Sequence, residues 1–211
     1  MYDLYKRTFD IFGSIILLIL FSPVIIITSI MIVFTSKGSA FYKNKRVGLN
    51  GKEFVHFKFR SMIVNAHEIM KTDPKFKKLY DDYKKGSFKS PKYDPRVTQI
   101  GWFIRSHSID EIPQFFNVLR GDMSIVGPRP YLREELDEQQ RKYPESEKFI
   151  KEALKVKPGI TGFWQVSGRS DIHFDKRIEM DAYYARKKSI LFDILILLKT
   201  PWIMISGKGS I

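Results

Sequence analysis

Residues 11–34 read IFGSIILLILFSPVIIITSIMIVF and contain no charged side chain. As one continuous helix this stretch would be about 36 Å long, which is enough to cross a bilayer. Pro23 lies at its centre, where it removes a backbone hydrogen bond and pushes Ser22 toward extended geometry. The sequence therefore predicts two apolar helices with a break at Ser22-Pro23, where the Ser22 hydroxyl supplies a local hydrogen-bond partner for the backbone.

The charges on both flanks of this stretch favour a hairpin. Lys6 and Arg7 precede it, and Lys37, Lys43 and Arg46 follow it, whereas a simple span carries its positive charge mainly on the cytoplasmic side. Two half-helices of about 11 residues would each reach roughly 16 Å, about half of the hydrocarbon thickness. We expect residues 1–36 to form a re-entrant membrane hairpin that enters and leaves one leaflet. A full span is the alternative, and labelling from the two sides of the membrane would distinguish them.

The composition limits the chemistry. The chain has 211 residues and a formal net charge of +13, so an anionic partner is expected: nucleic acid, an anionic membrane surface or a polyphosphate substrate. It has no cysteine, which excludes disulfides and thiolate ligands, and its histidines show no metal-ligand spacing. We expect residues 37–211 to form one cytoplasmic catalytic domain.

The fold class expected is α/β, mostly helical with a small β-hairpin and amphipathic helices at the membrane interface. Residues 40–62 alternate like two short strands around the turn at 48–51. Helical segments are expected at 62–83, 100–105, 109–119, 132–154 with a break near Pro144, and 174–187. A polar insertion occupies about 64–93, and its basic run is typical of a solvated surface. The apolar segment 189–205 predicts an interfacial helix or a helix packed on the domain.

The candidate chemistry centres on Asp110-Glu111. Adjacent carboxylates among arginines can hold a divalent metal and a phosphorylated substrate together, because metal and guanidinium groups neutralise phosphate oxygens. Neighbours on a helix point about 100° apart, so the two can differ in role, Asp110 as nucleophile and Glu111 as a Mg²⁺ ligand. The alternative is structural, since Ser108 to Glu111 also matches a capping box. The surrounding arginines are Arg96, Arg105, Arg120 and Arg129.

Further basic and acidic side chains are candidates for substrate contacts. Lys58 and Arg60 lie two apart on a predicted strand, share a face and could reach a pyrophosphate. Arg129 has little backbone freedom between two prolines. Arg169 follows the glycine-rich segment 161–168, and Asp181 is a candidate to orient a basic residue or a ligand.

Several motifs together resemble one family. They are Lys6-Arg7 with Asp10, Ser22-Pro23, Lys58 to Met62 (KFRSM), Asp94 to Arg96 (DPR), Ser108 to Gln114 (SIDEIPQ), Asn117 to Ser124 (NVLRGDMS), Gly127 to Pro130 (GPRP), and Gly159 to Gly162 (GITG) with Gly168-Arg169. In these motifs, over nearly its whole length, the chain resembles the bacterial sugar transferases, monotopic phosphoglycosyl transferases that act on undecaprenyl phosphate.

The resemblance implies a UDP-sugar donor, Mg²⁺, a covalent phosphosugar on Asp110, release of UMP, and attack by undecaprenyl phosphate. It makes Glu111, with Asp110, the metal ligand, and Lys58, Arg105, Arg129, Arg169 and Asp181 substrate contacts. It implies a membrane-embedded enzyme at the cytoplasmic face of the bacterial inner membrane, in contact with membrane lipids, without nucleic acid, and is compatible with a homodimer. An insertion at 64–93 is similar to that of hexose-1-phosphate transferases, which favours galactose or glucose. The competing class is a basic membrane-associated binding module, which would release no UMP.

Overall fold

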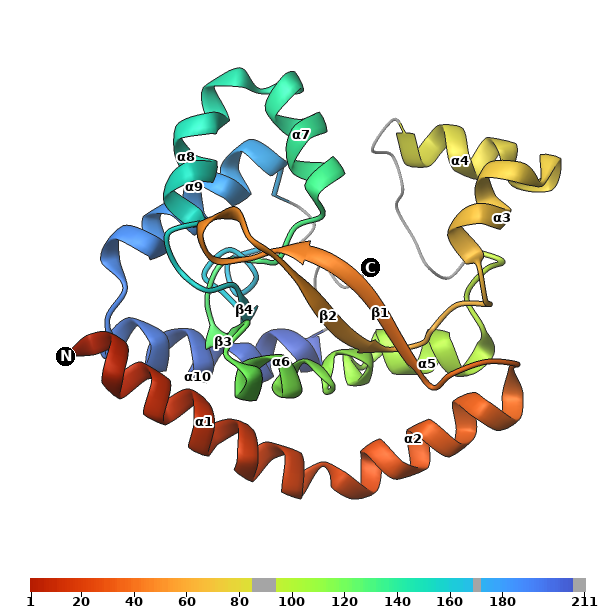
Figure 1. The fold of residues 1–211 in the computed structure, drawn as a ribbon, viewed down its shortest axis with the longest axis horizontal. Coiled ribbons are helices and arrows are strands. Elements are labelled where there is room, and N and C mark those ends of the chain that lie inside the picture. The colour runs from red at the N-terminus through yellow and green to blue at the C-terminus, as the bar shows by residue number, and fades with distance from the viewer. Residues whose placement is uncertain (85–93, 169–171, 207–211) are drawn as a thin grey trace.

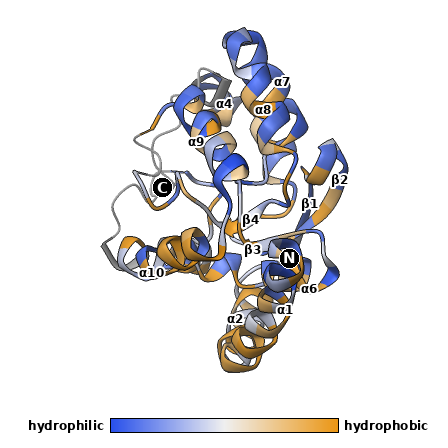
Figure 2. Ribbon diagram, turned by 90° about the vertical axis from the view of Figure 1, so that its left-hand side faces the viewer, coloured by the Kyte–Doolittle hydropathy of each residue, from blue (hydrophilic) through white to orange (hydrophobic). Residues whose placement is uncertain are grey.

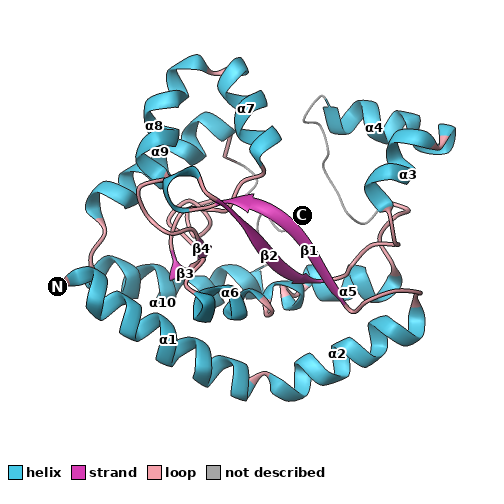
Figure 3. Cartoon of the chain, viewed as in Figure 1, coloured by secondary structure: helices cyan, strands magenta, loops and turns pink. Residues whose placement is uncertain are grey.

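The computed structural model describes all residues except 85–93, 169–171 and 207–211. The described residues are mostly helical, with a small antiparallel hairpin, as expected, and a second, parallel strand pair (Figure 3). The helices are α1 (Tyr2–Leu20), α2 (Ser22–Thr35), α3 (Ala66–Thr72), α4 (Lys77–Lys84), α5 (Gln99–Ser106), α6 (Gln114–Arg120), α7 (Arg133–Lys142), α8 (Glu147–Ala153), α9 (Phe174–Lys187) and α10 (Ile190–Ser206). The strands are β1 (Phe41–Val47), β2 (Glu53–Phe59), β3 (Ser124–Val126) and β4 (Gly159–Thr161).

The N-terminal helices form a shallow V along one side of the molecule (Figure 1). They bend by 60° between Leu20 and Ser22. Pro23 lies in the first turn of α2, where its missing N–H leaves no helix bond unmade, and the Ser22 hydroxyl donates to the Ile19 carbonyl at 2.8 Å. The predicted break at Ser22-Pro23 is therefore confirmed.

The apolar character of this pair is on its surface. Figure 2 shows hydrophobic ribbon over α1, α2 and much of α10. In the described residues no single helix is both long and apolar enough to cross a bilayer, whereas α1 and α2 meet that criterion together. Exposed apolar side chains on α1 and α2 include Leu4, Phe12, Ile16, Ile19, Leu20, Ile26, Ile27, Val33 and Phe34. Insertion of the pair into a membrane remains a prediction.

Polar contacts fasten α1 to the rest of the chain. The buried Asp10 carboxylate accepts from the Ser124 hydroxyl at 3.0 Å and from the Ile125 N–H at 2.9 Å. The Arg7 guanidinium donates to the carbonyls of Val118 and Leu119 in the last turn of α6. Because a helix C-terminus leaves carbonyls without partners, the cation is stabilising there. The N-terminal helix α1 and the segment that follows Asp110-Glu111 are thus joined directly.

The two strand pairs have different origins. β1 and β2 pair antiparallel, with Phe41 opposite Phe59 and Val47 opposite Glu53, around the turn that the sequence predicts. β3 and β4 pair in parallel and were not predicted, because each is three residues long and gives no alternation to read. Their contact needs glycine, since a Cβ on Gly159 would lie 2.0 Å from the Gly127 nitrogen.

Apolar clusters connect the layers. They are formed by α6, β3, α9 and α10 (Val118, Ile125, Tyr184, Ile196), by Tyr131 with α7, α8 and α9 (Leu136, Ile150, Ile178), and by α2, β2 and α5 (Ile32, Phe59, Ile104). Burial of each such isoleucine contributes about 2 kcal/mol. The last cluster holds α2 against the strand that carries Lys58.

Other expected segments differ in detail. The helix expected over 62–83 is divided into α3 and α4, because Pro74 begins a separate short turn between them. The segment 132–154 breaks at Pro144 as predicted, and α9 has the predicted bounds. α10 continues through Pro201 and packs Ile196 into the core.

Candidate active site

Asp110 and Glu111, the acid pair, contact a lysine from the β1–β2 hairpin. Lys58 on β2 places its Nζ 2.7 Å from Glu111 Oε1 and 3.5 Å from Asp110 Oδ2. The side chains are 26 %, 35 % and 11 % exposed for Lys58, Glu111 and Asp110, so Asp110 is the most enclosed of the three. The structure thus brings together three residues that the sequence predicted, from segments more than fifty positions apart.

A short 3-10 turn, Ile109–Glu111, presents the two carboxylates. Ser108 precedes it in a left-handed conformation with φ of 56°, and its side chain makes no cap hydrogen bond. The capping-box alternative is therefore wrong for this chain, because Glu111 bonds to Lys58 rather than to the backbone of Ser108. Pro113 then leads directly into α6, which divides the helix expected over 109–119.

The electrostatics of the two carboxylates differ. Burial raises the pKa of Asp110 and Glu111 adds to the increase, while Lys58 and Arg105 oppose it. Burial alone would raise the pKa of Glu111, but the ion pair with Lys58 outweighs it and lowers that pKa. For Lys58 burial favours the neutral amine, yet the two carboxylates raise its pKa. A cation is held against Glu111, and Asp110 is the more basic carboxylate.

The four arginines expected around the pair divide into two sets. Arg105 acts on Asp110, and Arg129 acts on Glu111 and Lys58. Arg96 instead forms a bidentate salt bridge with the buried Asp94, through Nη2 to Oδ2 at 2.6 Å and Nε to Oδ1 at 2.9 Å. Arg120 pairs with Asp122 at 3.2 Å. Of the four arginines near the pair in sequence, Arg105 and Arg129 therefore influence the pKa values of the carboxylates.

Arg60 is a correction to the prediction of a shared phosphate-binding face with Lys58. Its side chain is turned to the chain that leaves α2, where the guanidinium donates to four backbone carbonyls, those of Ser36, Lys37, Gly38 and Ser39. It is 7 % exposed. The reason is local: the strand β2 ends at Phe59, so alternation of faces does not extend to Arg60. Arg60 therefore holds the segment that leads from α2 to β1.

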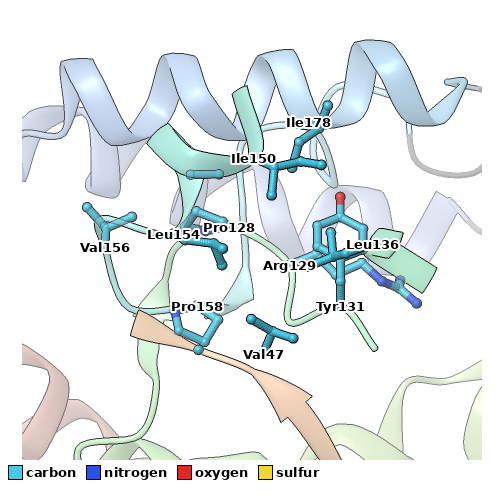
Figure 4. A pocket seen from close by; sticks show the side chains of 12 residues that line it. Val47, Pro128, Arg129, Tyr131, Leu136, Ile150, Leu154, Val156, Pro158 and Ile178 are labelled. Carbon is cyan, nitrogen blue, oxygen red and sulfur yellow. The ribbon is translucent and has the colours of Figure 1, made fainter. Parts of the chain in front are cut away.

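Arg129 and Asp181 lie at different depths. Figure 4 shows the Tyr131 ring inside an apolar lining with its hydroxyl toward α9, while the Arg129 guanidinium extends away from that lining. The hydroxyl donates to Asp181 Oδ2 at 3.1 Å, and Asp181 is 0 % exposed. Burial raises the pKa of Asp181 well above its ordinary value. The carboxyl is enclosed beneath the segment that carries Arg129, and the positive charges of Arg129 and Arg177 oppose the increase of its pKa. The role of Asp181 as a substrate contact stays a prediction. Arg169 lies outside the described residues.

Two buried residues near the pair were not singled out from the sequence. His56 is 2 % exposed, and burial, with Lys58 and Arg46, lowers its pKa to about 3, which keeps it neutral. Its position two residues before Lys58 on β2 was the available signal. Asn117 is 0 % exposed and bonds through its side chain to the backbone of β2. It stands in a quoted motif, but a pattern of letters does not reveal a side chain that pairs with a strand.

The carboxylates suit a metal that also binds substrate. In the described part of the chain no group of three or more His, Cys, Asp or Glu side chains could hold an ion. Mg²⁺ usually takes one or two carboxylates together with phosphate oxygens and water. The Lys58 ammonium shows that a cation is accepted against Glu111 and near Asp110. The pair fits such an ion.

Comparison with known proteins gives a consistent result. The profile of the family described as Bacterial sugar transferase matches residues 1–207. The chain is 42 % identical to the undecaprenyl-phosphate galactose phosphotransferase of Salmonella typhimurium, covering 97 % of this chain and 41 % of that protein. It is 40 % identical to the UDP-glucose:undecaprenyl-phosphate glucose-1-phosphate transferase of Klebsiella pneumoniae, covering 93 % and 39 %. The exopolysaccharide production protein ExoY of Sinorhizobium fredii is 37 % identical, covering 97 % and 87 %. The chain thus spans about two fifths of the first two relatives and most of the third.

Proposed function

Because the chain belongs to the bacterial sugar transferase family, we propose that it is a phosphoglycosyl transferase that moves a sugar-1-phosphate from a UDP-sugar to undecaprenyl phosphate. Two of the relatives are named for transfer of galactose phosphate and glucose phosphate, and a hexose is the donor sugar we propose. The observation that carries the proposal is the contact of Lys58 with both Asp110 and Glu111.

Asp110 has the properties of the nucleophile. It is the more enclosed carboxylate and has the higher pKa, which makes its anion the stronger base and nucleophile of the pair. Arg105 and Lys58 lower the repulsion between this anion and a diphosphate. In the first step the Asp110 oxygen attacks the phosphorus bonded to the sugar, and the bond to UMP breaks.

The second step restores the enzyme. A phosphate oxygen of undecaprenyl phosphate attacks the same phosphorus, the bond to Asp110 breaks, and undecaprenyl diphosphosugar leaves. We assign Arg129 to phosphate oxygens, because its guanidinium, like the Lys58 ammonium, is a positive charge that lowers the pKa of Glu111. Each step exchanges one phosphorus–oxygen bond for another, so no oxidant or further group is needed.

Glu111, with Asp110, would hold Mg²⁺. When bound, the ion neutralises diphosphate oxygens. Lys58 contacts Glu111 at 2.7 Å, so binding of a divalent ion there requires the ammonium to turn toward substrate phosphate. We therefore assign Lys58 two positions, one on Glu111 and one on the donor.

The proposed location of the protein rests on the N-terminal helix pair, α1 and α2. We propose that α1 and α2 enter one leaflet at the cytoplasmic face of the cell membrane, since most of their exposed side chains are apolar. Arg7 holds α1, and Arg60 holds the chain that leaves α2, against the rest of the protein. A soluble nucleotide sugar and a membrane-held phosphate would then meet at one site. The homodimer stays a prediction.

Asp110→Asn tests the proposal. We expect UMP release from UDP-galactose or UDP-glucose in the presence of polyprenyl phosphate to fall by at least about 10³-fold, because an amide does not attack phosphorus. Labelled phosphosugar should stay on the wild-type protein when acceptor is omitted and be absent from the variant. Asp137→Asn, the same change on the exposed surface of α7, is the matched control.

Two results would contradict the proposal in different ways. Normal turnover and label capture by Asp110→Asn would remove the nucleophile assignment. No UMP release from any UDP-sugar by the wild-type protein, combined with salt-sensitive binding to anionic vesicles, would favour a binding module.

A further inference from the structure

We propose that Asn117 is a positioning residue that fixes the placement of Lys58 relative to Asp110 and Glu111. The kinetic test of this inference rests on the proposed function. The contacts from which it is argued are independent of that function. Asn117 lies in the middle of α6, six residues after Glu111, and is 0 % exposed. Nothing in its sequence position requires an amide there.

The side chain of Asn117 pairs with β2 as a neighbouring strand would. Its Oδ1 accepts from the Phe57 N–H at 2.9 Å, and its Nδ2 donates to the Val55 carbonyl at 2.6 Å. One primary amide thus satisfies the donor and the acceptor that a strand presents between two ladder positions. β1 covers the opposite edge of β2, so Asn117 fills part of the edge that faces α6.

This contact is directly linked to the acid pair. Lys58 follows Phe57 in the chain, and the 3-10 turn with Asp110 and Glu111 leads through Pro113 into α6. Asn117 therefore ties the strand that carries the ammonium to the helix that follows the carboxylates. A shift of β2 against α6 would change the 2.7 and 3.5 Å separations, and a displacement of about 1 Å at a reacting centre can cost about 100-fold in rate.

Further bonds hold the amide in this orientation. The side-chain Nδ2 also donates to Asp122 Oδ2 at 3.4 Å, and the backbone carbonyl of Asn117 accepts from the N–H groups of Asp122 and Met123, which fixes the backbone of this residue. The amide has one possible orientation, because its oxygen must face the Phe57 N–H and its nitrogen must face the Val55 carbonyl. Aspartate is the same size but lacks the donor for Val55, and leucine lacks both groups.

Asn117→Ala is the test, with Tyr184→Phe as the matched control. Tyr184 is 1 % exposed and its hydroxyl donates to Asp193 and to the Val126 carbonyl, so this change also removes two buried hydrogen bonds, but near α10. Both are compared with the full-length wild-type protein in the same detergent, below the melting temperature of the less stable variant. Asn117→Ser replaces Asn117→Ala if too little folded protein is recovered.

The first readout needs no substrate. A carbodiimide couples a carboxylate to a touching amine, so the wild-type protein should give a Lys58–Glu111 cross-link that mass spectrometry can count. We expect at least a fivefold lower yield in Asn117→Ala and an unchanged yield in Tyr184→Phe. An equal yield in all three folded proteins would overturn the proposal.

The second readout separates chemistry from binding. We expect kcat for UMP release to fall by about 100-fold in Asn117→Ala with less than a threefold change in the KM for the UDP-sugar, and to stay within threefold in Tyr184→Phe. A parallel loss of kcat in the two variants would assign Asn117 a purely structural role. If the wild-type protein released no UMP, the proposed function would fail while the cross-linking result still decided the role of Asn117.

Discussion

Asp110 and Asp181 are both enclosed, and burial raises the pKa of both, but their surroundings differ. Asp110 shares the Lys58 ammonium with Glu111, which is partly exposed, and Arg105 opposes the increase of the Asp110 pKa. Asp181 meets the Tyr131 hydroxyl inside an apolar lining and is 0 % exposed. A raised carboxyl pKa therefore does not by itself mark a nucleophile. Partial exposure and contact with the Lys58 ammonium distinguish Asp110 from Asp181.

Removal of Lys58 should have the largest effect on the activity of the Asp110-Glu111 site. We expect Lys58→Met to lower the rate of UMP release by about 10³-fold or more, because two adjacent carboxylates lose the cation that contacts both. The same substitution should increase the pKa of Glu111, since Lys58 is what lowers it. Initial rates with a saturating UDP-sugar measure the effect.

Arg60→Met is the control for this prediction. It removes a cation two positions away whose hydrogen bonds go to the backbone after α2. We expect a lower melting temperature but a kcat within tenfold of wild type. If kcat fell equally in the two variants, the assignment of Lys58 to the active site and of Arg60 to a structural role would be wrong.

The pH dependence sharpens the comparison at Asp110. Attack requires the anion, so activity should fall as the pH decreases through the pKa of Asp110, which lies above the ordinary aspartate value. Arg105 lowers that pKa, and Arg105→Ala should therefore move the acidic limb to higher pH. We expect about a tenfold greater loss at the low-pH end than at the high-pH end, measured as kcat/KM across the range. A limb that does not move would show that Arg105 does not act on Asp110.

Substitution of Asp181 should have the smallest effect. Its pKa is raised in the folded state, so its contribution to stability is present at pH below the unfolded pKa and is lost as the pH rises through the folded pKa. Asp181→Asn keeps an acceptor for Tyr131 and removes this loss. We expect activity within threefold of wild type and a melting temperature about 3 °C higher at pH 8, with little change at pH 4. A loss comparable to that of Asp110→Asn would make Asp181 part of the chemistry.

Much of the candidate site was predictable, and the failures have physical causes. Asp110, Glu111 and Lys58 were assigned from residue type and motif, and the structure places them in contact. Arg60 does not share a face with Lys58, because alternation along a strand says nothing about where the strand ends. The burial of Asp181 was not predicted, because helical spacing does not tell which face is buried. The capping box failed because the same letters permit two partners for Glu111, and an ion pair was formed in place of a cap.

The sequence by itself determined the bent helix pair, the β-hairpin, α9 and the identity of the acid pair. These depend on local effects: a proline without an N–H, alternation around a tight turn, helical periodicity and the chemistry of neighbouring side chains. Only the tertiary structure decided which charges meet. The Lys58 contact joins residues 52 and 53 positions apart, and β3 pairs with β4 through two glycines. Such contacts depend on the packing of whole elements, which no short window of sequence contains.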